Sequence, residues 1–280
     1  MTNLNFSVDK NKCISCNACV KDCPRSIIKN PDGKIPCIPP GLEADCIECQ
    51  HCLAVCPAAA ISILGVTPDA CLPLTAGTIP TLAQQTRLLR GRRSVRQFMQ
   101  QNINPGQIQE LLATVANSPT GCNDQALRFT LIEDRAAMQC LLTRIVNLLE
   151  AELNLGRLDA ESFLAEAVTA YRKDGTDNFF RGAPHALIVS AGPAATCPIE
   201  DVNIALAYFE LLAQSAGFGT LWCGILKFAL DAAPELKKLL KLDGEQYFYT
   251  VLFGVPAVHY ARTVLRDNAA EIRRITVDEL

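Results

Sequence analysis

Eight of the 14 cysteines form two runs with the same spacing, Cys-x-x-Cys-x-x-Cys-x-x-x-Cys-Pro. The runs consist of Cys13, Cys16, Cys19 and Cys23, followed by Cys46, Cys49, Cys52 and Cys56. Matched positions lie 33 residues apart (13 to 46), which indicates an internal duplication. Two residues between successive thiolates allow one short loop to wrap three corners of an iron–sulfur cube. The spacing therefore indicates iron–sulfur chemistry.

Clustered cysteines also form zinc sites and disulfides. Zinc ligands usually come as two pairs with a longer gap between them, whereas here four cysteines fall within eleven residues. The pattern resembles bacterial ferredoxins that carry two 4Fe–4S clusters, in which the fourth cysteine of each run binds the other cluster. The resemblance implies one cluster on Cys13, Cys16, Cys19 and Cys56, and a second on Cys46, Cys49, Cys52 and Cys23.

The composition suits a globular redox protein of one or two domains. The 280 residues are 49% apolar, which is enough for a sizeable core, and the net charge of −3 argues against a nucleic-acid binder. The N-terminal residues do not have the pattern of a signal peptide, and no apolar run approaches the length of a membrane span. We expect a reducing cytoplasm, because oxygen often damages exposed clusters.

The other six cysteines show no pairing pattern and lie mostly in apolar surroundings. We interpret them as reduced thiols that act as small apolar residues. They are Cys37, Cys71, Cys122, Cys140, Cys197 and Cys223.

The chain divides into three predicted parts. Residues 1–66 form the ferredoxin-like domain, residues 67–82 form a proline-containing linker, and residues 83–280 form a second domain. In the second domain, apolar periodicity predicts helices after Asn104-Pro105 and after Asp134, and another that stops at Gly217. Strands are predicted at 127–132, 186–191 and 247–253, and helix in part of 152–182. Helices and strands do not alternate regularly, so the predicted class is α+β.

A second candidate site begins with the basic segment Arg92-Arg93-Ser94-Val95-Arg96. Three guanidinium groups and a hydroxyl within five residues favour anion binding, although a solvated basic turn has the same composition. Three further segments accompany it: a polar loop at 119–125, a glycine-rich stretch predicted as a turn at 217–224, and Gly254-Val255-Pro256, which ends a strand.

These four segments, in this order, resemble the nitroreductase family of FMN-dependent oxidoreductases over about 190 residues (87–280). The resemblance implies that Arg92, Arg93 and Ser94 hold the flavin phosphate, and that Arg96 reaches the ribityl chain or the N1/O2 edge of the ring. A cation there stabilises the anionic reduced flavin. Arg262 matches a late basic residue that binds the phosphate.

The resemblance also assigns the other two segments to the flavin. The polar loop, with Pro119, Thr120, Asn123 and Gln125, reaches the flavin from the partner subunit of a homodimer. Backbone N–H groups near Cys223 and Gly224 face flavin N5. Gly217-x-Gly219 is not a dinucleotide fingerprint, because it follows a helix and lacks the third glycine.

The resulting hypothesis is an oxidoreductase that passes electrons from two 4Fe–4S clusters to FMN and on to a nitroaromatic, a quinone or an activated double bond. A low-potential ferredoxin or flavodoxin is a candidate donor, and a nicotinamide dinucleotide would dock only transiently. The alternatives are an electron relay between redox partners, or a flavin-fragmenting or reductively dehalogenating relative. No catalytic side chain is predicted, and His51, His185 and His259 are interpreted as structural.

Overall fold

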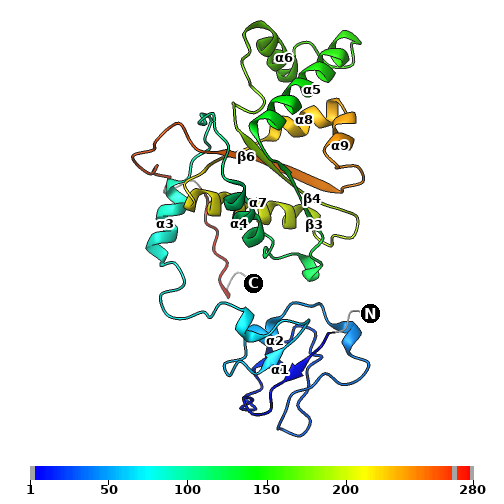
Figure 1. Ribbon diagram of the computed structural model, residues 1–280, viewed down its shortest axis with the longest axis vertical. Helices are drawn as coiled ribbons and strands as arrows, with labels where there is room; N and C mark the ends of the chain where they lie inside the picture. Colours follow the sequence, from blue (N-terminus) through cyan, green and yellow to red (C-terminus); the bar gives the residue numbers. More distant parts are fainter. Residues whose placement is uncertain (1–3, 267–269, 278–280) are drawn as a thin grey trace. The chain divides into compact units, whose positions relative to one another are not determined.

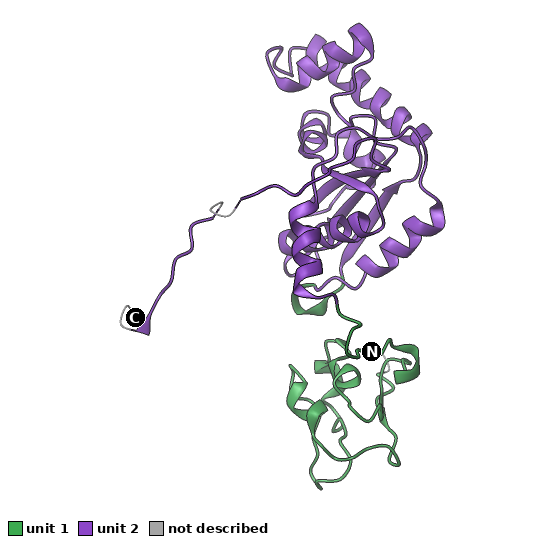
Figure 2. Cartoon of the chain, turned by 90° about the vertical axis from the view of Figure 1, so that its left-hand side faces the viewer, with its two compact units in different colours: residues 1–79, 120–125 green, residues 80–119, 126–280 purple. Residues whose placement is uncertain are grey.

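The computed structural model describes residues 4–266 and 270–277 (Figure 1). The chain forms two compact units (Figure 2). Unit 1 consists of Met1–Ile79 together with the short segment Thr120–Gln125. Unit 2 consists of Pro80–Pro119 and Ala126–Leu280. The segment 120–125 is therefore an excursion into unit 1 of a stretch of chain that belongs to unit 2 on both sides.

Unit 1 is small and has little regular structure. Its helices and strands are β1 (Ser7–Val8), α1 (Ala18–Asp22), η1 (Glu43–Asp45), α2 (His51–Ala54), β2 (Ile61–Ser62) and η2 (Pro68–Ala70). The two strands pair antiparallel, with Ser7 opposite Ser62. The helices α1 and α2 begin 33 residues apart (18 and 51), so the duplication predicted from the cysteines extends to the local fold.

Isoleucines form most of the small core of unit 1. Ile27, Ile28, Ile61 and Ile63 are each no more than 3% exposed. Ile61 belongs to strand β2, whereas Ile27 and Ile28 are buried without pairing as a strand.

Unit 2 is built around a four-stranded antiparallel sheet with the order β3-β4-β6-β5. The strands are β3 (Leu127–Ile132), β4 (His185–Ala191), β5 (Gly219–Trp222) and β6 (Tyr247–Gly254). Every residue of β4 is buried, which is expected of a central strand covered on both faces. The predicted strands at 127–132, 186–191 and 247–253 are confirmed.

Helices cover both faces of this sheet (Figure 1). Ala186, Ile188 and Leu252 face α5, α6, α8 and α9, while Leu187 and Phe253 face α4 and α7. This alternation follows from the two-residue side-chain period of a strand. The helices of unit 2 are α3 (Leu82–Gly91), α4 (Pro105–Val115), α5 (Arg135–Asn154), α6 (Phe163–Asp174), α7 (Pro198–Ser215), α8 (Gly224–Ala232) and α9 (Glu235–Leu239), and η3 (Gly121–Asn123) lies in the excursion. The α+β class is confirmed.

Two helix starts agree with the sequence prediction. Asn104 Oδ1 accepts a hydrogen bond from the Gly106 N–H at 2.8 Å, and Pro105 is the first helical residue of α4. Asp134 Oδ1 likewise accepts from the Ala137 N–H at 2.8 Å and begins α5.

The predicted glycine-rich turn at 217–224 is wrong over most of its length. Only Gly217, with φ +83°, is in a turn, because residues 219–222 form β5 and Gly224 begins α8. A Cβ on Gly219 would lie 2.5 Å from Val95 Cγ2. Glycine is therefore required at this position by a close approach of another segment rather than by a turn.

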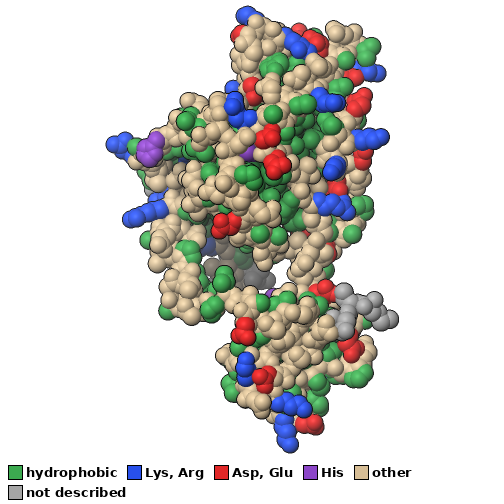
Figure 3. Space-filling view, in the orientation of Figure 1, with side chains coloured by type: hydrophobic (Ala, Val, Ile, Leu, Met, Phe, Trp, Pro, Cys, Tyr) green, Lys and Arg blue, Asp and Glu red, His purple; other side chains and the backbone are tan. Residues whose placement is uncertain are grey.

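No helix in the described residues is both long and apolar enough to cross a membrane. Basic and acidic side chains are interspersed over the face of unit 2 shown in Figure 3.

Candidate functional site: two cysteine cavities and a flavin-type segment

Unit 1 brings the eight motif cysteines together around two separate cavities. The first cavity is lined by Cys13, Cys16, Cys19 and Cys56. The second cavity is lined by Cys23, Cys46, Cys49 and Cys52. Each cavity therefore takes three thiols from one run and the fourth from the other run, which is the crossed arrangement implied by the sequence.

Most of the other residues that line the two cavities are apolar, apart from Asn17 at the first and Gln50 and His51 at the second. Ile14 and Ile61 line the first, and Ile27, Ile38 and Ile63 line the second. Dry surroundings are one of the features that set the reduction potential of an iron–sulfur cluster.

Backbone N–H groups donate hydrogen bonds to two of the cysteine sulfurs. Glu48 N–H donates to Cys46 Sγ at 3.4 Å, and Ala60 N–H donates to Cys56 Sγ at 3.3 Å. Such bonds stabilise sulfur that carries negative charge, as it does when bound to iron.

Burial raises the pKa of Cys19 and Cys46, and raises the pKa of Cys52 to about 11. These thiols are therefore protonated at neutral pH in the protein alone. Binding of iron displaces the protons, so assembly of the site releases them.

The donor set fits 4Fe–4S clusters. Four thiols surround each cavity, and all cysteines in the described chain are free of disulfides. Within residues 4–266 and 270–277, no three His, Cys, Asp or Glu side chains converge as a single metal ion requires.

In unit 2, the basic segment predicted at 92–96 lies along the edge strand β5. Val95 N–H donates to the Thr220 carbonyl at 2.8 Å, and Ser94 pairs with Thr220 as a parallel bridge. Further along, Met99 N–H donates to the Val255 carbonyl at 2.8 Å. Three of the four segments singled out in the sequence therefore meet at one side of the sheet, and Gly219 provides the space for this approach.

Arg92 makes an ion pair that the sequence analysis did not anticipate. Arg92 Nη1 lies 3.0 Å from Glu210 Oε1, and the Glu210 side chain is only 9% exposed. Thr220 Oγ1 donates to the same oxygen at 3.2 Å. The sequence signal for this contact was a carboxylate in a mostly apolar part of α7, next to Phe209 and three residues before Ala213.

The other two arginines of the segment are less constrained. Arg93 Nη2 donates to the Arg90 carbonyl at 3.2 Å, and its Nε is buried without a hydrogen-bond partner. Arg96 is exposed. An unsatisfied guanidinium N–H beside an exposed cation leaves donors available for an anionic ligand. Arg262 is exposed in the segment that follows β6.

The backbone N–H groups of Cys223 and Gly224 lie at the end of β5 and the start of α8. Cys223 N–H donates to the Thr250 carbonyl at 2.9 Å, so this N–H already has a hydrogen-bond partner within the protein. Gly224 is the first residue of α8, where the N–H has no partner within its helix. Burial raises the pKa of the Cys223 thiol to about 12, so this thiol is neutral.

The polar loop is divided between the two units: Pro119 belongs to unit 2, while Thr120–Gln125 belongs to unit 1. Within unit 1, Asn123 Nδ2 donates to the Ile47 carbonyl at 2.8 Å. Thr120 Oγ1 accepts from the Gln125 N–H at 3.0 Å. Cys122, Asn123 and Gln125 have φ of 53°, 58° and 49°, which is unusual for residues other than glycine.

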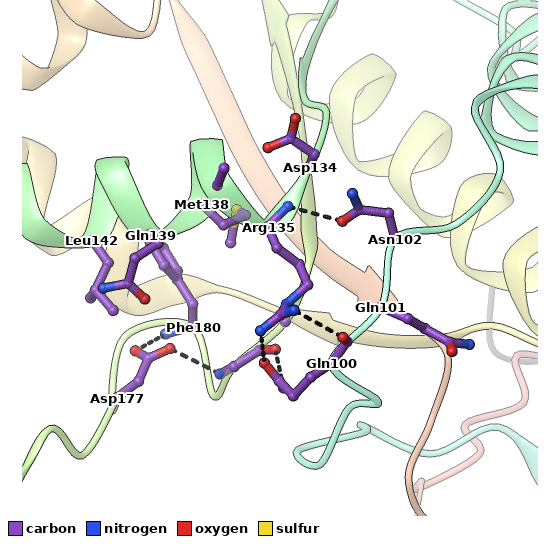
Figure 4. Close-up of a pocket in the computed structure, with 13 residues that line it drawn as sticks. Gln100, Gln101, Asn102, Asp134, Arg135, Met138, Gln139, Leu142, Asp177 and Phe180 are labelled. Atoms are coloured by element: carbon purple, nitrogen blue, oxygen red, sulfur yellow. Dashed lines mark hydrogen bonds between the residues drawn. The ribbon is translucent and has the colours of Figure 1, made fainter.

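A cavity of about 510 Å³ in unit 2 contains none of the predicted flavin residues (Figure 4). Arg135 donates to both the backbone and side-chain oxygens of Gln100, at 2.9 and 3.0 Å. Asp177 accepts from backbone N–H groups, among them Gly182 N–H at 2.9 Å. These charged side chains already form hydrogen bonds within the protein. We therefore interpret the cavity as a structural feature rather than a ligand site.

The fold and these residues define an α+β flavin-type enzyme unit in the same chain as a ferredoxin-type unit. The nitroreductase family profile matches residues 89–255, more than half of the chain, and the chain belongs to this family. A 4Fe–4S dicluster domain profile matches residues 10–61. Both predicted resemblances are confirmed, and the protein is a nitroreductase-family oxidoreductase with a 4Fe–4S ferredoxin-type domain.

Solved structures show the same fold. An FMN-dependent nitroreductase from Clostridium difficile R20291 is 20% identical, with a TM-score of 0.52, over 69% of this chain and 99% of its own. A nitroreductase with bound FMN from Bacteroides fragilis NCTC 9343 is 21% identical, with a TM-score of 0.54, over 68% of this chain and 98% of its own. The comparison with curated proteins found no match.

Proposed function

We propose that the protein passes electrons from two 4Fe–4S clusters to FMN, and from FMN to a small acceptor such as a nitroaromatic, a quinone or an activated double bond. The observation that carries the proposal is the presence of two separate sets of four thiols in one chain with a nitroreductase fold. When bound, the clusters supply single electrons and FMN couples them to a two-electron reduction.

The residues of the chain bind and orient these groups. Cys13, Cys16, Cys19 and Cys56 would hold the first cluster, and Cys46, Cys49, Cys52 and Cys23 the second. Arg92, Arg93, Ser94 and Arg96 would bind the flavin phosphate and ribityl end, with Arg262 as a further cation. The Gly224 N–H would face the flavin ring at the start of α8.

The assembly and the donor follow from the same proposal. A homodimer would let Pro119, Thr120 and Gln125 complete the flavin site of the partner subunit. A low-potential ferredoxin or flavodoxin in a reducing cytoplasm would supply electrons to the cysteine-rich unit.

The cofactor content of the anaerobically purified protein tests this proposal. We expect about eight irons and one FMN per chain, since each cluster has four irons and the ligand sets are complete. The same sample should sediment as a dimer. Zinc in place of iron would refute the cluster assignment, and an active, fully loaded monomer would refute the dimer.

Replacing Cys56 with alanine tests the crossed ligation. Cys56 belongs to the second run in sequence but lines the first cavity. We expect Cys56→Ala to lose or alter the electron paramagnetic resonance (EPR) signal of the first cluster and to preserve the second. Cys23→Ala should do the reverse, because Cys23 lines the second cavity. If Cys56→Ala instead altered the second cluster and Cys23→Ala the first, the crossed assignment would be wrong.

A further inference from the structure

One peptide group of unit 1 connects the polar loop to a cysteine of the second cavity. The carbonyl of Ile47 accepts a hydrogen bond from Asn123 Nδ2 at 2.8 Å. The N–H of the same peptide group belongs to Glu48 and donates to Cys46 Sγ at 3.4 Å. A single rigid, planar unit therefore lies between the Asn123 amide and a sulfur of the second set.

The local backbone does not prefer the conformation that produces this contact. Glu48 has φ 57° and Asn123 has φ 58°, both in the left-handed region. That region is unfavourable for glutamate and better tolerated by asparagine, whose short polar side chain bonds locally. The orientation of the Ile47–Glu48 peptide group consequently depends on the hydrogen bonds at its two ends.

We propose that Asn123 is a positioning residue for the second cysteine set, because its amide orients the Ile47–Glu48 peptide group so that the N–H points at Cys46 Sγ. The proposal rests on the proposed function, which places a 4Fe–4S cluster in the second cavity. It gives Asn123 a role different from the flavin contact implied by the resemblance.

The expected consequence is a higher reduction potential for the second cluster. Hydrogen bonds to cluster sulfurs help to set the potential, and they favour the reduced form because it carries more negative charge. Donation from the Asn123 amide to the carbonyl also polarises the peptide group and strengthens its N–H as a donor.

The first cysteine run supplies an internal reference. The residue matching Ile47 is Ile14 (47 minus 33), and it is 67% exposed, whereas Ile47 is half-buried. Loss of the Asn123 amide should therefore leave the first cluster unchanged.

The test is Asn123→Gly in the holoenzyme, followed by an EPR-monitored redox titration. Glycine adopts a positive φ without strain, so this variant removes the amide and preserves the loop conformation. We expect the reduction equilibrium constant of the second cluster to fall about threefold, a shift of ~28 mV at 59 mV per tenfold change. The Cys56→Ala and Cys23→Ala variants identify which signal belongs to which cluster.

Two comparisons complete the design. Asn123→Asp keeps the shape and the tolerance of positive φ, but it removes the donor and adds a negative charge; both lower the potential of the second cluster, which should therefore fall further than in Asn123→Gly. Asn117→Ala is the matched control, because the Asn117 amide also donates to a backbone carbonyl, that of Ala113 at 3.1 Å, but at the end of α4 in unit 2. It should leave both potentials unchanged.

The FMN dissociation constant, measured on the same samples, should stay within about twofold of the wild type in the two Asn123 variants and in Asn117→Ala. An unchanged second-cluster potential in Asn123→Gly would overturn the inference, and a concurrent loss of FMN would assign the side chain to the flavin. If the wild-type protein holds no second cluster, the proposed function and this inference fail together. A loaded second cluster without a shift defeats the inference alone.

Discussion

Replacing Cys16 with alanine is expected to abolish reduction of a small acceptor when a low-potential ferredoxin is the electron donor. Cys16 lines the first cavity with three other thiols, and a 4Fe–4S cluster held by three cysteines is readily lost or altered. The rate with the protein donor should fall to the background level. Reduction of the same acceptor should persist when dithionite reduces FMN directly.

The matched control for this experiment is Cys37→Ala. Cys37 is an exposed cysteine of unit 1 that lines neither of the two thiol cavities. Both activities should survive in this variant. If Cys16→Ala also retained both activities, the clusters would not lie on the electron path. If it lost both with FMN still bound, unit 1 would shape the active site rather than supply electrons.

Replacing Arg92 with alanine is expected to weaken both FMN binding and folding. Loss of a charge-assisted contact to the phosphate should cost roughly 1.5–3 kcal/mol of binding free energy, or about 10- to 150-fold in affinity. The same change leaves the buried Glu210 carboxylate without its ion-pair partner. The Arg92 side chain is 33% exposed and that of Glu210 9%, so the loss should cost about 1–3 kcal/mol of the free energy of unfolding.

A second substitution separates these two effects. Arg92→Ala combined with Glu210→Gln removes the unpaired charge and keeps the side-chain volume, so most of the lost stability should return while FMN affinity stays low. Urea denaturation of the flavin-free protein measures the stability, and quenching of flavin fluorescence measures the affinity. If FMN affinity recovered together with stability in the double variant, Arg92 would act only through folding.

The sequence alone was sufficient for features that depend on residues close together in the chain. The cysteine spacing identified the iron–sulfur unit, because a loop of fixed length determines which thiols reach one cube. The cap at Asn104-Pro105 and the apolar period after it located a helix, because capping and amphipathicity act within a few turns. The fold class followed from the order of the predicted helices and strands, and the nitroreductase resemblance from four segments in order over about 190 residues.

Contacts between distant segments were decided only by the tertiary structure. Glu210 forms an ion pair with Arg92, although the two residues are 118 positions apart in the chain. No local sequence pattern predicts which cation a buried carboxylate pairs with. The glycine at 219 looked like a turn residue, yet it lies in a strand because Val95 occupies the space of its Cβ. The Asn123 amide donates to the carbonyl of Ile47, the residue after Cys46, although Asn123 and Ile47 are 76 positions apart in the chain. Pairing of this kind depends on how elements pack, and the packing is set by the whole core rather than by any single segment.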